Sequence, residues 1–448
     1  MAPLHIKVFN DPKLLEESDW VTFRNQLKLS KDMGISAVSV DVWWGDVEAE
    51  NDNVFNWGYY RSVFKEITDQ GLDIIPILSF HQCGGNVGDN YTSLLPQWIW
   101  PKLVDENQKI ASDIDLKYVS DATDENGDLK FSNEYVALWA DEFVLSQYVE
   151  LMQAFKNEFQ NYRDQIQEIN ISCGPSGELR YPSYNSHDNW SYPGSGHLQC
   201  YSNLALKDFS KSMEKRYATL AIMNEAWSTN YNSFDEVSFP ENGDEFFESG
   251  EYYSTPFGQD FVDWYNQSMV DHGIRMMQAA ADVFETTDST GIALGFKIPG
   301  IHWQMQNPNS PRASEIKCGL INAKNLSGAR GYYETLSEIF EALPNDKVNL
   351  HFTCLEMGNE YSGEGVSDHY SRAQDLVFQV DSVARALKIR VKGENALSGN
   401  LYSDFGWDRL EEALTKGSYE GITILRMGDV TTDNELGNLR YEKIIKEY

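Results

Sequence analysis

The stretch that decides the fold is INISCGPSGELRYPSY, residues 169–184. Its opening residues, 169–171, form a short apolar run that is typical of a buried strand. The Gly-Pro-Ser-Gly break at 174–177 ends that strand, and Glu178 follows directly. In a (β/α)8 barrel, the catalytic groups lie just beyond the carboxyl ends of the strands. The stretch therefore predicts a catalytic carboxylate at Glu178, with a solvated loop Glu as the alternative.

The rest of the chain alternates strand signals with helical periodicity. The connections between strands are longer than a hairpin turn, so the strands should be parallel with helical crossovers. About eight such units favour a closed barrel over an open doubly wound sheet. The expected strands are 5–8 (very short), 37–42, 74–80, 169–171, 292–298, 348–353, 389–391 and 421–426, and helices are expected over 18–33, 60–70, 142–159, 261–284 and 372–387.

The expected architecture is a single α/β domain over residues 1–448, a (β/α)8 TIM barrel. No repeated block, linker or low-complexity run divides the chain. Long loops after strands 3, 4 and 5 are expected to form a small lobe. The longest polar segments are 82–130 and 181–257. Loops of this length in a compact fold tend to bind or cover a ligand.

Composition excludes several classes of function. The net charge is −33, from 36 basic and 69 acidic residues, which disfavours nucleic acid and anionic membranes as partners. No apolar run approaches the roughly 20 residues of a membrane span, and no GxGxxG or P-loop motif supports nucleotide binding. The 5 cysteines lack CxxC spacing and read as isolated thiols. These features fit a soluble enzyme with a neutral substrate.

Polar side chains follow the expected strands at the end where a barrel has its mouth. One such residue would be chance, but several at the same end of successive strands should converge on one site. Two carboxylates follow the fourth and seventh strands, on opposite sides of a barrel, an arrangement that suits cleavage of a glycosidic bond. The strand-end residues are Asp41, His81, Glu178, Lys297, Thr353, Glu394 and Arg426.

Six blocks of the sequence resemble the β-amylase family, whose members are inverting, exo-acting α-1,4-glucan maltohydrolases. Their order and rough spacing match the family, and the resemblance covers nearly the whole chain. Blocks this long are far more specific than a lone short motif. The blocks are DVWWG at 41–45, HQCGGNVGD at 81–89, GELRYPSY at 177–184, GIHW at 300–303, TCLEM at 353–357 and GENALS at 393–398.

The resemblance assigns the two carboxylates different roles. Glu178 resembles the general acid that protonates the glycosidic oxygen, and Glu394 resembles the general base that activates water. Inversion requires carboxyl groups roughly 6.5–9.5 Å apart, which leaves room for that water. Glu178 must stay protonated, so burial or a nearby negative charge is expected to raise its pKa. Glu394 must be ionised, and the adjacent Asn395 is expected to orient the base or the sugar.

Further residues are expected to bind the glucan, again by resemblance. Asp41, His81 and Arg426 resemble the residues that hold the terminal glucose pair. Segment 84–89 resembles a mobile lid whose glycines give it backbone freedom. Glu356 is expected to be structural rather than catalytic. The complete set of expected substrate-binding residues is Asp41, His81, Asp89, Lys297, His302, Thr353, Asn395, Ala396 and Arg426.

The resemblance implies no cofactor for the chemistry, but it does suggest a structural Ca²⁺. Glu48, Asp52 and Glu150 fall at positions similar to those of calcium ligands in bacterial relatives, and Gln147 stands where a carboxylate is expected. Hard oxygen ligands suit calcium. The alternative is an acidic loop that faces solvent.

Several departures from the family pattern bear on compartment and substrate. Residues 1–4 lack signal-peptide features and the first strand is short, so we expect an extracellular protein if the natural start lies upstream and a cytoplasmic one otherwise. Ser176 and Cys173 replace smaller residues, and Gln304 stands where an aromatic is often found. No separate starch-binding domain is expected before the chain stops at Tyr448. Starch, amylose and maltodextrin are the expected partners.

Three functional readings remain at this point. The first is an active β-amylase that degrades starch-like polysaccharides. The second is a catalytically silent homologue that senses glucan or sugar, which the retention of Glu178 and Glu394 disfavours. The third is a retaining barrel glycosidase with two Glu residues, for which the carboxyl groups would lie about 5 Å apart.

Overall fold

A curled sheet of parallel strands forms the centre of the protein. The computed structural model describes residues 16–84, 92–288, 291–324, 326, 330–344, 347–360 and 369–448. In that part of the chain, seven strands pair in chain order, and every pairing between neighbours is parallel. They are β1 (Ala37–Trp43), β2 (Asp73–Ser79), β5 (Glu168–Ile171), β6 (Ala293–Ile298), β7 (Val348–Phe352), β8 (Arg390–Glu394) and β9 (Tyr419–Thr423).

This strand order is that of a (β/α)8 barrel, as the sequence predicts. The first expected strand, 5–8, lies outside the described residues. Seven of the expected strands are confirmed, with small differences at their ends. The last one stops at Thr423 rather than Arg426 because the backbone N–H of Leu425 donates to the side-chain oxygen of Asn395 (2.7 Å). Arg426 lies just beyond β9, in extended backbone as an isolated bridge residue.

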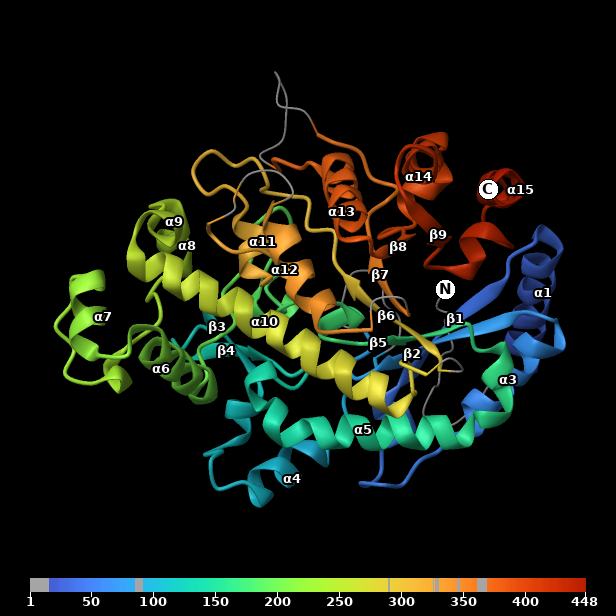
Figure 1. Cartoon of the computed structure of the whole chain (residues 1–448). Coiled ribbons are helices and arrows are strands. Elements are labelled where there is room, and N and C mark those ends of the chain that lie inside the picture. Colours follow the sequence, from blue (N-terminus) through green and yellow to red (C-terminus); the bar gives the residue numbers. More distant parts are fainter. Residues whose placement is uncertain are drawn as a thin grey trace.

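Helices join the strands and surround the sheet (Figure 1). Around the barrel these are α1 (Glu17–Met33), α2 (Trp44–Val47), α3 (Gly58–Asp69), α5 (Asp141–Glu158), α10 (Pro256–Val283), α11 (Ala313–Lys317), α12 (Arg330–Glu341), α13 (Ala373–Leu387), α14 (Asp404–Lys416) and α15 (Glu435–Glu447). Within the described residues, no helix is long and apolar enough to cross a membrane.

Local sequence signals explain where several helices begin and end. Helix α1 ends at Gly34, which adopts the left-handed conformation (φ 97°) that glycine tolerates best. Helix α10 begins five residues before the expected start. The Thr255 side chain accepts a hydrogen bond from the N–H of Gly258 (3.0 Å), and Pro256 occupies the first helical position. This combination of an N-cap Thr and a Pro is a strong helix start.

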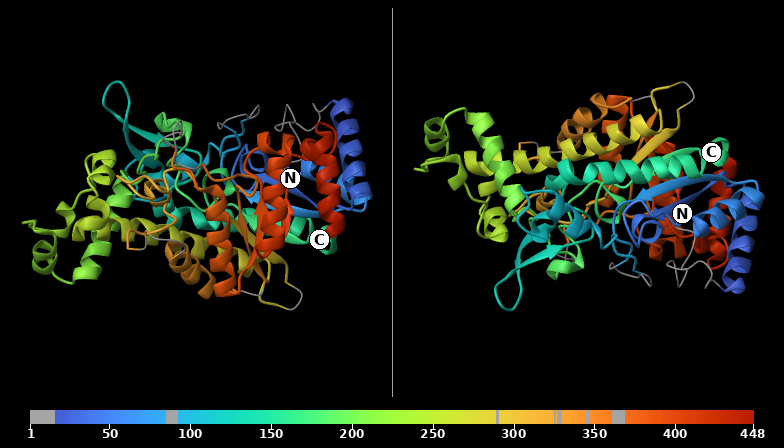
Figure 2. Two further views of the ribbon diagram at one scale, coloured as in Figure 1. Left: turned by 90° about the horizontal axis from the view of Figure 1, so that it is seen from above. Right: turned by 90° about the horizontal axis from the view of Figure 1, so that it is seen from below.

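A small lobe lies to one side of the barrel, as expected from the long loops (Figures 1 and 2). The loop after β2 contributes α4 (Ile99–Glu106) and the antiparallel pair β3 (Tyr118–Thr123) and β4 (Leu129–Ser132). The loop after β5 contributes α6 (Asn203–Tyr217), α7 (Leu220–Trp227), α8 (Gly243–Glu248) and α9 (Glu251–Ser254). Helix α10 then runs from the lobe back along the barrel (Figure 2).

A cluster of polar side chains joins three strands in the interior of the barrel. Glu168 on β5 pairs with Lys392 on β8 (2.6 Å) and with His351 on β7, and it also accepts from Asn349. Burial alone would raise the pKa of Glu168, but His351 and Lys392 lower it to about 2. The ionised carboxylate therefore stabilises the fold above about pH 4.3, its unfolded value, and this contribution is lost as the pH falls toward 2.

Candidate active site

The turn that carries Glu178 is held in an unusual backbone conformation. Ser176 (φ 57°) and Gly177 (φ 77°) both adopt positive φ values in the short turn after β5. A Cβ added to Gly177 would lie 3.2 Å from the His81 ring, so glycine is needed both for its backbone and for its size. The turn brings Glu178 beside β6, where the N–H of Leu179 donates to the carbonyl of Lys297 (2.7 Å).

The Glu178 carboxyl group is oriented by two neighbours from the same stretch of chain. Its Oε2 accepts hydrogen bonds from Arg180 Nε (2.9 Å) and from the Tyr184 hydroxyl (3.2 Å). The guanidinium of Arg180 lies 4.0 Å above the Tyr184 ring. About an eighth of the Glu178 side chain is exposed (12%), and its Oε1 has no hydrogen-bond partner among the described residues. Oε1 is therefore the oxygen available to a substrate.

Sequence reasoning missed Arg180 and Tyr184 as functional residues. Both were visible in the block at 177–184, and an Arg two residues from a predicted catalytic Glu was the available signal. The expectation for Glu178 was burial or a nearby negative charge. The structure does bury Glu178 (9% of the residue is exposed), and it also places a cation, Arg180, against the carboxyl group.

Glu394 lies at the end of β8 and forms an ion pair with Lys297 on β6. The Lys297 ammonium contacts both carboxylate oxygens, at 2.8 and 2.7 Å, and only 7% of the Glu394 side chain is exposed. Burial alone would raise the pKa of Glu394, but the charge and hydrogen bond of Lys297 outweigh it and hold the pKa below the ordinary value. Glu394 is therefore ionised, which suits a general base.

Lys297 connects three of the predicted carboxylates electrostatically. Burial works to lower the pKa of Lys297, but Glu394, then Glu178 and Asp41, raise it above its ordinary value. Asp41 on β1 accepts from the Ser79 hydroxyl (3.0 Å), and burial raises its pKa although Lys297 opposes this. The strand ends of β1, β6 and β8 thus converge on one mouth, together with the turn after β5.

Two histidines at the mouth are neutral. His81 bonds Ser172 through Nδ1 (2.7 Å), and its pKa falls to about 3 through burial and through the charges of Lys297 and Arg180. His302 bonds Ser371 in the same way (2.7 Å), and burial lowers its pKa to about 4. Neutral imidazoles suit hydrogen bonding to sugar hydroxyls because they add no charge to a neutral substrate.

The loop after Glu394 is held rigidly by two buried side chains. Asn395 donates to the carbonyl of Leu397 (3.3 Å) and accepts from Leu425. Glu356 accepts from the N–H groups of Ala396 (3.1 and 3.0 Å) and Leu397 (2.9 Å). Burial raises the pKa of Glu356 to about 7 against these hydrogen bonds. The contacts give Glu356 the structural role expected of it.

The remaining predicted residues occupy the surrounding wall. The hydroxyl of Thr353 accepts from the N–H of Gly300 (2.8 Å) and so ties the end of β7 to the segment after β6. The Trp303 ring lies near Tyr184 (5.1 Å between centroids), which continues the wall toward Glu178. Arg426 lies three residues after the end of β9 and donates to the carbonyl of Leu425 (3.4 Å). Asp89 lies outside the described residues.

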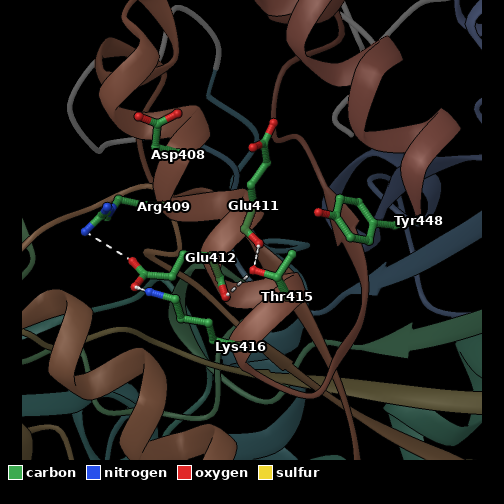
Figure 3. Close-up of a pocket in the computed structure, with 7 residues that line it drawn as sticks. All are labelled: Asp408, Arg409, Glu411, Glu412, Thr415, Lys416 and Tyr448. Carbon is green, nitrogen blue, oxygen red and sulfur yellow. Dashed lines mark hydrogen bonds and ion pairs between the residues drawn. The ribbon is translucent and has the colours of Figure 1, made fainter.

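Two surface hollows lie elsewhere and contain none of the predicted catalytic or substrate-binding residues. The hollow in Figure 3, about 260 Å³, is lined by α14 side chains and Tyr448, and Glu412 pairs there with Arg409 (3.2 Å) and Lys416 (2.7 Å). The other hollow, about 530 Å³, lies between the ends of β3 and α8. The strand-end mouth therefore remains the candidate active site.

Comparison with known proteins identifies the family of this chain. The sequence profile of glycosyl hydrolase family 14 matches residues 10–446. The chain belongs to glycosyl hydrolase family 14. It is 37% identical over 423 residues to the β-amylase of Cytobacillus firmus, and the aligned region covers 94% of this chain and 82% of that protein. It is 35% identical over 434 residues to the thermophilic β-amylase of Thermoanaerobacterium thermosulfurigenes, and the aligned region covers 97% of this chain and 72% of that protein.

Solved structures support the same family and the barrel. The catalytic domain of the β-amylase from Paenibacillus polymyxa superposes with a TM-score of 0.82 at 33% identity, with 96% of this chain and 95% of that chain covered. A β-galactosidase from Marinomonas ef1 superposes with a TM-score of 0.56 at 13% identity, with 97% of this chain and 58% of that chain covered. The second likeness shows a shared fold alone. The family 14 chain is therefore a (β/α)8 barrel and a glycoside hydrolase.

The ion pair of Lys297 generates a prediction about pH dependence. Lys297→Met removes the cation while burial of Glu394 remains, so the pKa of Glu394 should rise. A general base must be ionised, and the acidic limb of kcat/KM should therefore move to higher pH by about one unit or more, a tenfold loss on that limb. Lys297→Arg, which keeps the charge, is the control and should move the limb less. An acidic limb that stays in place in Lys297→Met would contradict the role of the pair.

Proposed function

We propose that this family 14 chain is an active β-amylase, which hydrolyses α-1,4-glucosidic bonds from the non-reducing ends of starch-like glucans and releases β-maltose with inversion. The observation that carries the proposal is the unequal treatment of two buried carboxyl groups at one barrel mouth. Glu394 is paired with a lysine and ionised. Glu178 keeps one oxygen without a partner among the described residues, and 12% of its side chain is exposed. Both positions match the family's sequence blocks.

The general acid step assigned to Glu178 uses its Oε1. A proton on Oε1 passes to the glycosidic oxygen as the bond to the anomeric carbon breaks, and the bonding electron pair leaves with that oxygen. Arg180 and Tyr184 hold Oε2, so the carboxyl group presents Oε1 in a fixed direction. They also stabilise the carboxylate that remains after the transfer.

The general base step assigned to Glu394 acts on the opposite face of the sugar. A water molecule between the carboxylate and the anomeric carbon gives one proton to Glu394 and forms the new C–O bond. Inversion follows because water enters opposite the departing oxygen. Lys297 bonds both oxygens of Glu394 and so fixes the direction in which the base points.

We propose starch, amylose and maltodextrin as substrates. Neutral His81 and His302, with Asp41, offer hydrogen-bond donors and acceptors to sugar hydroxyls. Arg426 and Thr353 are proposed to add polar contacts. The Trp303 ring offers an apolar face of the kind that stacks on pyranose rings.

We also propose a structural calcium ion beside α2 and α5, away from the chemistry. Burial raises the pKa of Glu48 to about 7, and Asp52 and Glu150 add to the rise. Gln147 Oε1 and Glu150 Oε2 are buried and accept no hydrogen bond from the described chain. Carboxylate and amide oxygens are the donors that calcium prefers. Against this, Lys102 pairs with Asp52 (2.8 Å), and the described residues bring no three His, Cys, Asp or Glu together for a metal.

The calcium proposal predicts a stability effect without a catalytic one. Millimolar Ca²⁺ added to chelator-treated protein should raise Tm by at least about 2 °C, because the ion would offset the mutual repulsion of Glu48, Asp52 and Glu150. Glu150→Gln should abolish the increase, whereas Glu285→Gln, a surface carboxylate paired with Lys156, should retain it. Differential scanning calorimetry measures both. A Tm that does not respond to Ca²⁺ would remove the ion from the proposal.

The stereochemistry of the product tests the proposed function itself. During the first minutes of amylose hydrolysis, the ¹H NMR spectrum should show β-maltose before mutarotation produces the α anomer. Early α-maltose would instead establish a retaining mechanism. No release of maltose by folded protein would favour the silent sensor.

Replacement of Glu178 and replacement of Glu394 should impair catalysis in different ways. Glu178→Gln removes the proton donor, so kcat on starch should fall by about 10² to 10⁴. Cleavage of α-maltosyl fluoride, which has the α configuration of the natural bond and a leaving group that needs little protonation, should be largely retained. Glu394→Gln removes water activation and should be damaging on both substrates. Added azide should partly restore Glu394→Gln by direct attack.

The control for this comparison is Glu285→Gln, which should leave both activities unchanged. The pH profile gives an independent check, because loss of Glu394 should remove the acidic limb and loss of Glu178 the basic limb. Retained fluoride hydrolysis in Glu394→Gln but not in Glu178→Gln would mean that the two roles are reversed.

A further inference from the structure

Glu134 is a buried carboxylate close to the site that the mechanism above does not use. It lies between β4 and α5, and 7% of the residue is exposed. Its backbone carbonyl accepts from the N–H of Gln82 (2.7 Å), the residue directly after His81. Its side chain accepts from the amide of Asn185. Asn185 is itself buried (1% exposed), so Glu134 is joined to the interior of the site rather than to solvent.

A continuous chain of hydrogen bonds runs from Glu134 to Glu178. Asn185 donates to Glu134 through its amide nitrogen and accepts from Arg180 Nη1 through its oxygen (2.9 Å). Arg180 in turn donates from Nε to Glu178 Oε2 (2.9 Å). Asn185 has one donor group and one acceptor group engaged, so it can orient only one way between its two charged neighbours.

Arg180 is immobilised on every side. Its Nη1 also donates to the carbonyl of Tyr181 (3.1 Å), its Nη2 donates to Ser176 Oγ (3.1 Å), and its plane stacks on Tyr184. Only 1% of the residue is exposed. Ser176, one of the departures from the family pattern, therefore contributes a direct contact to this arginine. A buried guanidinium requires compensating negative charge, and Glu178 and Glu134 supply it from opposite ends.

We propose that Glu134 is a positioning residue that acts through Asn185 and Arg180 on the general acid Glu178. By sharing the charge of Arg180, Glu134 limits how strongly that arginine stabilises ionised Glu178, and so keeps the acid protonated at higher pH. By anchoring the guanidinium through Asn185, it also fixes the direction of the Glu178 carboxyl group. The proposal rests on the general-acid role of Glu178 proposed above.

The charges around this chain agree on the sign of the effect. Glu178 faces Arg180, Tyr184, Lys297 on β6, and the thiols of Cys318 and Cys354. Glu134 faces Arg180 and Asp188; burial raises its pKa, and Arg180 and Asn185 oppose the rise. Removing the Glu134 charge leaves Arg180 to act on Glu178 without competition and removes a direct repulsion between two carboxylates. Both changes favour the ionised form of Glu178.

The test is the pH profile of kcat/KM on maltoheptaose for Glu134→Gln, which keeps an acceptor for Asn185 but loses the charge. The basic limb should move to lower pH by about half a unit to one unit, a loss of about threefold to tenfold on that limb, while the acidic limb set by Glu394 stays in place. On α-maltosyl fluoride the loss should disappear. Asn185→Ala, which breaks the link and leaves Glu134 in place, should lower kcat on maltoheptaose more than it changes KM.

Asp381→Asn is the matched control, because Asp381 is also a buried carboxylate, on α13, and it binds Arg385 and Ser418 at the amino end of β9. It should leave both limbs unmoved. A folded Glu134→Gln protein with an unmoved basic limb, or a shift of the same size in Asp381→Asn, would overturn the proposal. If Glu178→Gln itself retains the basic limb, the assignment of Glu178 fails first. If Glu178→Gln loses that limb and neither Glu134→Gln nor Asn185→Ala disturbs it, only the positioning role fails.

Discussion

The buried ion pair between Lys297 and Glu394 is the constraint on which the rest of the site depends. A carboxylate that is 93% withdrawn from solvent would take up a proton unless a cation is held against it. The cation comes from another strand, because Lys392, the β8 cation two residues before Glu394, is already paired with Glu168. Parallel pairing through β7 sets the distance between β6 and β8. The pairing of the barrel strands therefore keeps Glu394 ionised.

The two halves of the chemistry are supported by different kinds of structure. Glu394, Lys297 and Asp41 project from strands, and their relations are set by the sheet. Glu178 lies on an irregular turn, and its partners Arg180 and Tyr184 come from the following six residues of the same segment. A turn of this kind depends on side-chain packing for its shape. The stacked pair of Tyr181 and Tyr265 (4.0 Å between centroids) supplies that packing from α10.

Much of the fold and the location of the site could be predicted from sequence, because both follow from short-range patterns. Apolar runs separated by helical periodicity predicted the described strands of the sheet, and the strand-end positions of Asp41, Lys297 and Glu394 followed from them. The predicted end of β9 was wrong because the side chain of Asn395, rather than a neighbouring strand, accepts the hydrogen bond from the N–H of Leu425. The hydrogen bond between Glu134 and Asn185 was also beyond prediction, since it joins residues 51 positions apart.

Glu178 and Glu394 differ in how closely they are connected to the lobe. The segment that orients this carboxyl group leads directly into the lobe, and α10 returns the chain to the barrel next to it. The neighbours of Glu394 belong to β6, β7 and β8 and to the loop that Glu356 holds. Substitutions in the lobe therefore reach the Glu178 carboxyl group through its own segment of chain. They reach Glu394 only through Lys297, whose charge both carboxyl groups share, so the lobe can tune the environment of Glu178 more directly than that of Glu394.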